Sequence, residues 1–168
     1  LVRHLAQLEA EGRLVPGHEI LLIPSANPYS MNIGKRFWPM DNTDINRMFP
    51  GYDQGETTQR IAASLFEAIQ GYTYGIQLAS FYVPGDFIPH VQIIKTGYED
   101  VQAAGLFGFP YICLRESLPF DTTLLNYNWQ IWNTKAYSIY GGQSGQVEGS
   151  MPSYILSSVL RFMQRVGI

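Results

Sequence analysis

Short apolar segments alternate with helical patterns along most of this chain of 168 residues. The apolar segments are too short for helices and are predicted to be buried strands, at residues 19–24, 74–79, 90–94, 109–114 and 136–140. Helical spacing of apolar residues occurs between or beside them, at residues 2–11, 57–70, 99–107 and from residue 150 onwards. Such alternation predicts an α/β protein whose sheet is covered by helices on both faces.

Two long stretches lie outside this pattern. Residues 25–56 are expected to be irregular, and loops of that length are usually functional or contain local structure. Residues 119–133, which are rich in Asn, Thr and aromatic side chains, are expected to cover a pocket or to pack over the sheet edge. Ligands of such sheets bind beyond the carboxyl ends of the strands, so residues 25–56 and 80–89 are predicted to emerge on the same side.

The composition narrows the possible partners and the compartment. A net charge of −3 and a pI near 5.5 provide no basic stripe for a nucleic acid. No apolar run is long enough to cross a bilayer, and the single cysteine excludes a disulfide framework. Cys113 lies in an apolar run and is predicted to be a buried, inert thiol. We therefore expect a cytoplasmic protein without nucleic-acid or membrane partners, and leave formation of a homo-oligomer open.

Charged side chains gather in residues 36–51, although only 15% of the chain is charged. This segment contains Arg36, Asp41, Asp44, Asn46 and Arg47 among apolar and turn-forming residues. A planar guanidinium can hold a carboxylate with two parallel hydrogen bonds, and an amide can fix its orientation. The pattern therefore predicts an anion site. The alternative is a surface turn in which Asp44 is a cap and Arg47 pairs with Asp41 or Asp44.

Two motifs carry a resemblance to a known family. The first is Ile23-Pro-Ser-Ala-Asn-Pro28, and the second runs from Arg36 to Asp44-Ile-Asn-Arg-Met-Phe-Pro-Gly51. In this order they resemble the succinylglutamate desuccinylase/aspartoacylase family of zinc carboxypeptidase-like hydrolases. The resemblance continues more loosely through the helix at 57–70, the strand at 90–94 and the closing helix.

The resemblance implies a fold and a set of substrate contacts. It implies a carboxypeptidase-like catalytic domain over residues 1–168, with a mixed, mostly parallel sheet whose first strands are expected to lie outside the sequence. In the family, an upstream arginine and an Asn-Arg pair orient the substrate carboxylate and polarise the scissile carbonyl. By resemblance, these roles fall to Arg36, Asn46 and Arg47.

The zinc ligands expected from the family are not found in the sequence. Family members use a His-x-x-Glu motif and the histidine of an Asp-Leu-His motif, and this chain contains no His-x-x-Glu. The Asp-Leu-His position corresponds to Gln77-Leu78-Ala79, and alanine cannot bind a metal. His90 is the candidate replacement ligand; the alternative is a histidine at a strand end or in a pocket wall. His4 and His18 are expected on the surface.

The catalytic glutamate of the family is also replaced. Tyr140 occupies the corresponding end of a late strand, and Glu148 follows shortly after it. A tyrosine could donate a hydrogen bond to an oxyanion, but its ordinary pKa of about 10 makes it a poor base at neutral pH. Tyr140 and Glu148 are therefore weak catalytic candidates.

The sequence thus leads to three functional hypotheses. The first, by resemblance, is a zinc-dependent hydrolase of an amide or ester bond in an N-acyl amino acid or a similar carboxylate-bearing small molecule. The second is a non-catalytic carboxylate-binding domain that has lost its zinc site. The third is a scaffold in which the old pocket has only a structural role.

Overall fold

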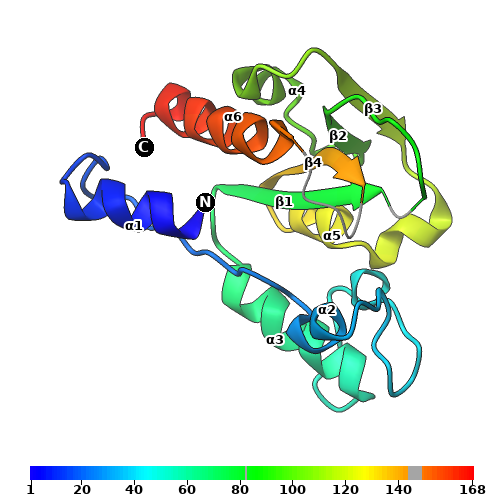
Figure 1. Ribbon diagram of the computed structural model, residues 1–168. Coiled ribbons are helices and arrows are strands. Elements are labelled where there is room, and N and C mark those ends of the chain that lie inside the picture. The colour runs from blue at the N-terminus through cyan, green and yellow to red at the C-terminus, as the bar shows by residue number, and fades with distance from the viewer. Residues whose placement is uncertain (82, 144–148) are drawn as a thin grey trace.

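Four strands form one sheet in the computed structural model, which describes residues 1–81, 83–143 and 149–168. The strands are β1 (Tyr74–Phe81), β2 (His90–Lys95), β3 (Ile112–Glu116) and β4 (Lys135–Gln143). Their order across the sheet is β1-β4-β2-β3. β1 is parallel to β4 and β2 to β3, whereas β2 is antiparallel to β4. This mixed, mostly parallel sheet confirms the predicted fold class (Figure 1).

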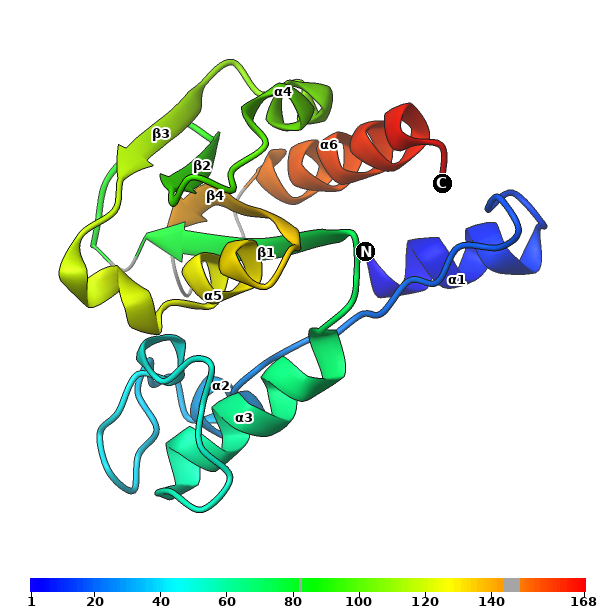
Figure 2. The same cartoon turned by 180° about the vertical axis from the view of Figure 1, so that it is seen from behind.

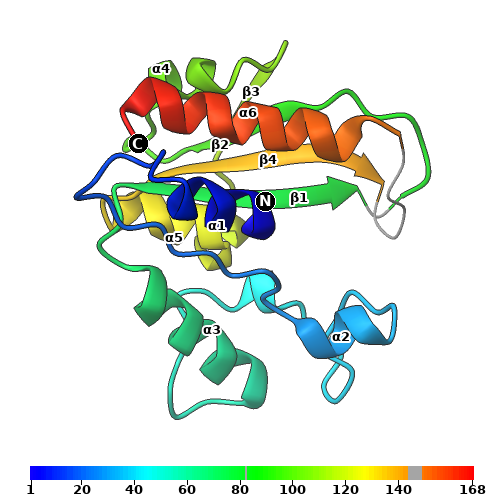
Figure 3. The same cartoon turned by 60° about the vertical axis from the view of Figure 1, so that its left-hand side comes forward.

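Helices cover both faces of the sheet. The α-helices are α1 (Val2–Ala10), α2 (Pro28–Asn32), α3 (Thr57–Ile69), α4 (Val101–Ala104), α5 (Leu125–Ile131) and α6 (Met151–Val166). The short 3-10 helices are η1 (Ile45–Arg47), η2 (Gly105–Phe107) and η3 (Pro119–Thr123). Figure 3 shows α6 on one side of the sheet and α5 on the other. Among the described residues, no helix is long and apolar enough to span a membrane.

Each face of the sheet has its own apolar core. Val91, Tyr137 and Ile139 point toward α6 and pack against Phe162 and other residues of that helix. On the opposite face, a cluster that includes Phe66 of α3, Trp129 of α5 and Ala136 of β4 joins these elements to η1. The alternation of side chains along each strand therefore separates an apolar α6 side from an α5 side that also carries the residues of the second motif.

The predicted long helices are confirmed, and local signals explain their limits. In α3, Glu56 and Gln59 form a capping box, in which the Glu56 amide donates to Gln59 Oε1 at 3.0 Å. In α6, Pro152 lies in the first turn and Gly167 ends the helix in the left-handed conformation. The predicted helix at 99–107 consists of α4 followed by η2.

Two strand predictions were wrong in part or in whole. Residues 19–24 are not a strand: they run between α1 and α2 without a ladder partner (Figure 2). The strand predicted at 109–114 begins and ends later, as β3, and it forms the sheet edge. Because β3 pairs only with β2, Cys113 is exposed, which corrects the prediction of a buried thiol.

Candidate functional site

The second motif is built around a capped turn. Asp44 Oδ1 accepts a hydrogen bond from the backbone amide of Asn46 at 3.0 Å and begins η1. Its other oxygen, Oδ2, accepts from Arg36 Nη2 at 2.8 Å. The surface-turn alternative is therefore right about the Asp44 cap. Arg36, rather than Arg47, is the arginine that pairs with Asp44.

Arg47 and the residues beside it attach the turn to η3. Arg47 Nη1 donates to the carbonyl oxygen of Phe120 at 3.3 Å, and its guanidinium lies over the Phe120 ring, 5.5 Å from the centroid. The amide of Phe49 donates to the carbonyl oxygen of Thr123 at 3.1 Å. Asp41 instead accepts from the Thr43 amide and the Thr58 hydroxyl. The arginine is thus held at a backbone carbonyl, with most of its donors outside this contact.

The end of the motif is fixed by packing. Phe49 is 4% exposed and packs in the α3–α5 core. Gly51 has a φ of +93°, and a Cβ at this position would lie 2.1 Å from the backbone nitrogen of Ala63 in α3. Only glycine combines this conformation with so close an approach. The Phe-Pro-Gly ending is therefore a structural requirement of the turn.

A partly buried ion pair, in which only the Asp121 carboxylate is fully buried, holds η3 in place. Arg115 of β3 donates to both carboxylate oxygens of Asp121, at 2.7 and 3.0 Å, and the amide of Leu118 donates to one of them at 2.8 Å. Burial raises the pKa of Asp121, but hydrogen bonds from Arg115 and Leu118 outweigh it and the pKa is lowered. The pKa of Arg115 is raised mainly by its hydrogen bond to Asp121. The sheet thereby supports the segment on which Arg47 rests.

Asn46 faces the sheet through its amide. Its Oδ1 accepts from Gln77 Nε2 of β1 and from the backbone amide of Leu125 at the start of α5, both at 3.4 Å. Gln77 Oε1 in turn accepts from Asn126 Nδ2 at 2.5 Å. Asn126 also donates to Ser138 Oγ of β4 at 2.7 Å. Sequence patterns alone assign no role to Asn126 or Ser138, and Gln77 stands out there only as a departure from the family pattern.

The carboxyl ends of β1 and β4 bring the other candidates together. Ala79 pairs with Tyr140, and Tyr140 pairs with His90 at the start of β2. The rings of His90 and Tyr140 are stacked, with centroids 5.4 Å apart, and Phe81 contacts both. His90 Nδ1 lies 2.9 Å from the carbonyl oxygen of Ile88. His90 therefore reaches the same end of the sheet as Ala79, within an aromatic cluster.

This arrangement does not fit a catalytic zinc ion. Throughout residues 1–81, 83–143 and 149–168, no three His, Cys, Asp or Glu side chains are grouped so that they could hold a metal. His90 instead contacts the aromatic rings of Phe81 and Tyr140. Glu148, the second catalytic candidate, lies outside the described residues.

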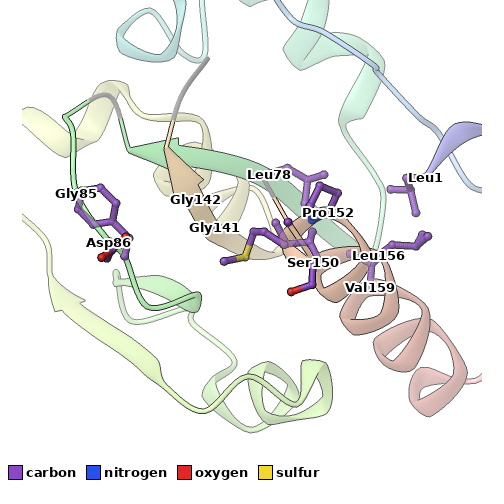
Figure 4. A pocket seen from close by; sticks show the side chains of 14 residues that line it. Leu1, Leu78, Gly85, Asp86, Gly141, Gly142, Ser150, Pro152, Leu156 and Val159 are labelled. Atoms are coloured by element: carbon purple, nitrogen blue, oxygen red, sulfur yellow. The ribbon is translucent and has the colours of Figure 1, made fainter. Parts of the chain in front are cut away.

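A separate hollow of about 820 Å³ lies near the amino end of α6 (Figure 4). Leu78, Phe87, Gly141, Met151 and Ile155 are among the residues that line it. None of the three predicted substrate-binding residues belongs to its lining. The candidate carboxylate site is therefore a feature of the surface formed by η1 and η3, on the α5 side of the sheet.

Comparison with known protein families gives a match that covers both motifs. Residues 1–80 match the family model described as Succinylglutamate desuccinylase/Aspartoacylase catalytic domain. No curated protein sequence matches the chain significantly.

Solved structures share the fold over most of the chain. A succinylglutamate desuccinylase/aspartoacylase from Rhodobacter sphaeroides has 18% identity and a TM-score of 0.70, over 86% of this chain and 44% of its own. The product-bound ectoine utilization protein EutE (DoeB) from Ruegeria pomeroyi has 17% identity and a TM-score of 0.75, over 88% and 46%. An aspartoacylase family protein from Mesorhizobium loti has 19% identity and a TM-score of 0.63, over 87% and 46%.

The chain thus spans less than half the length of each of these structures. The family match covers both motifs, and the shared fold extends over the sheet and helices that follow them. Residues 1–80, just under half of the chain, thus match the succinylglutamate desuccinylase/aspartoacylase family, and most of the chain shares the fold of solved structures described as its members.

Proposed function

We propose that this chain is the carboxylate-binding part of a hydrolase that acts on an amide or ester bond in an N-acyl amino acid or a similar small molecule. The observation that carries the proposal is the placement of Asn46 and Arg47 on one short turn, which η3 and β1 hold from two sides. Arg47 is exposed and uses one of its five N–H donors in the described part of the chain. A carboxylate can take up the others.

The family match supports the hydrolase, and the product-bound structure of EutE (DoeB) supports a small-molecule ligand. Arg47 would supply the charge that pairs with the ligand carboxylate, while Asn46 would fix its orientation. Arg36, which is also engaged by Asp44, would contribute at the rim of the same turn. Residues 1–168 would then be one carboxypeptidase-like catalytic domain.

The chemical step needs an activated water, and the described residues offer no group of metal ligands to activate one. This observation favours a second candidate function, a carboxylate-binding domain without catalysis. Both candidates require the carboxylate site. They differ in whether zinc and hydrolysis accompany it.

Binding of succinate, measured by isothermal titration calorimetry, tests the site. We expect Arg47→Ala to weaken the affinity about 30-fold, because a charge-assisted hydrogen-bonded pair is worth about 2 kcal/mol. Arg60→Ala is the matched control, since Arg60 is an exposed arginine on α3 away from the turn. An unchanged affinity in Arg47→Ala contradicts both candidate functions, and the scaffold hypothesis then remains.

Metal content and hydrolysis separate the two candidates. The hydrolase is expected to carry one zinc ion per chain, to cleave N-acyl amino acids, and to lose this activity in His90→Ala. A protein that binds succinate but contains no zinc and cleaves no N-acyl amino acid is the non-catalytic binding domain.

A further inference from the structure

We infer that Gln77 and Asn126 are positioning residues for Asn46, which fix its amide so that the NH2 group faces the ligand. This inference rests on the proposed function of the Asn46–Arg47 turn. The three amides form a continuous chain from η1 through β1 to α5, which packs beneath the sheet (Figure 3). The chain ends at Ser138 Oγ in β4. Among the described residues, the Asn46 side chain makes its hydrogen bonds through Oδ1.

The direction of the amides follows from one backbone group. The N–H of Leu125 can only donate, so the oxygen of Asn46 must face it. Gln77 reaches the same oxygen and must therefore present its NH2 group, which turns its own oxygen toward Asn126. Asn126 meets that oxygen with its NH2 group and donates also to Ser138. Reversing any one amide would place two oxygens or two donors against each other.

The buried position of Asn126 indicates that its amide serves as a hydrogen-bond donor rather than as packing material. Asn126 is 5% exposed and Ser138 7% exposed. Asn126 Oδ1 is buried and has no partner in the described part of the protein. A buried polar atom without a partner is unfavourable, and an apolar side chain would avoid this penalty. The amide is explained if its NH2 group is needed to donate both to Gln77, which it orients, and to Ser138.

This chain of amides, the relay, uses a hydrogen-bond donor at position 77. A carboxylate at this position accepts hydrogen bonds but donates none, so it would repel Asn46 Oδ1 while keeping its contact with Asn126. In Gln77→Glu, repulsion between the two oxygens is expected to displace the Asn46 side chain and to change the direction of its NH2 group. Gln92→Glu is a matched control: Gln92 lies in the same row of the sheet, beyond Ser138, and takes no part in the amide chain.

Two measurements test the relay in the full chain. We expect Gln77→Glu and Asn126→Leu to weaken succinate binding about tenfold, with Gln92→Glu within twofold of the original protein. The side-chain NH2 signals of Asn46 in a ¹⁵N–¹H spectrum, identified by their loss in Asn46→Ala, are expected to shift in ligand-free Gln77→Glu and not in Gln92→Glu. These signals report the orientation of the amide and would not respond to a general loss of stability.

The outcomes distinguish this inference from the function on which it rests. If Arg47→Ala weakens succinate binding but Gln77→Glu leaves affinity and the Asn46 signals unchanged, the relay is overturned and the carboxylate site stands. If the original chain binds no succinate, the proposed function fails, and the relay fails with it. Should Asn126→Leu not fold, Gln77→Glu decides alone, since its side chain is only partly buried.

Discussion

The motif turn at residues 36–51 and the carboxyl ends of β1 and β4 are organised differently. In the turn, Asn46 and Arg47 are held by atoms of other elements, including backbone groups of η3 and α5. At the strand ends, Ala79, Tyr140 and His90 share a row, and two of them mainly contact other aromatic rings. The first region is the candidate carboxylate site, and in the second the described residues include no group of three potential metal ligands.

Under the proposed function, carboxylate binding and hydrolysis would therefore depend on different parts of the fold. The turn is fixed by capping, by a close backbone approach and by a partly buried ion pair beneath it. None of these three contacts is made by Ala79, Tyr140 or His90. Substitutions can therefore disturb one region and leave the other, which makes the comparison testable.

The largest effect is expected from Gly51→Ala. The new Cβ would lie 2.1 Å from the Ala63 backbone nitrogen, at a φ of +93°. Strain and overpacking together should lower the free energy of unfolding by about 4 kcal/mol. Gly71→Ala is the control: its φ is +83° but no atom lies within 4 Å, so about 1 kcal/mol is expected. Equal losses in urea unfolding would show that the close approach does not fix the turn.

The next largest effect is expected from Arg115→Ala. This change leaves the carboxylate of Asp121 buried without its partner, which should cost about 3 kcal/mol of stability at neutral pH. Because η3 carries the contacts to Arg47 and Phe49, succinate affinity should fall as well. Lys95→Ala, which removes an exposed ion pair with Glu116 on the same strand pair, serves as the control. If the variant is destabilised but binds succinate normally, the Arg115–Asp121 pair is not required to position the turn.

A smaller effect is expected from pH. The pKa of Asp121 is lowered in the folded chain, because hydrogen bonds from Arg115 and Leu118 outweigh burial. Its stabilisation is therefore complete above the ordinary aspartate pKa of about 3.9 and is lost as the pH falls through the lower folded value. Thermal unfolding between pH 7 and pH 2 should show this loss, and Asp121→Asn should reduce it. An unaltered pH profile in Asp121→Asn would show that ionisation of Asp121 does not stabilise the folded chain.

Much of the fold could be predicted because its signals are local. The periodicity of α3 and α6 and the short apolar runs of β1, β2 and β4 lie within single segments. The strand prediction at 19–24 failed because a strand also needs a neighbour, which no local pattern supplies. Cys113 was misjudged for a related reason: an apolar run does not reveal whether its strand lies at the centre or the edge of a sheet.

The placement of the candidate site residues could be predicted only where they lie in one motif. Asn46 and Arg47 stand side by side in the sequence, so their joint placement followed from the motif. Gln77, Asn126 and Ser138 come from three elements, and only the sheet register brings them together. A weak signal for Asn126 existed in the four-residue spacing of Asn126 and Gln130, which places two amides on one face of α5 beside Trp129.

The smallest effect is expected from His90→Ala, and it tests the comparison most directly. If the strand ends form an aromatic cluster separate from the turn, this change removes the stacking on Tyr140 and costs about 1 kcal/mol of stability. Succinate affinity should stay within twofold, and the exposed His18→Ala should change neither quantity. A tenfold loss of affinity in His90→Ala alone would mean that the ligand touches both regions. The turn and the strand ends would then form one site, and their description as two separate regions would be wrong.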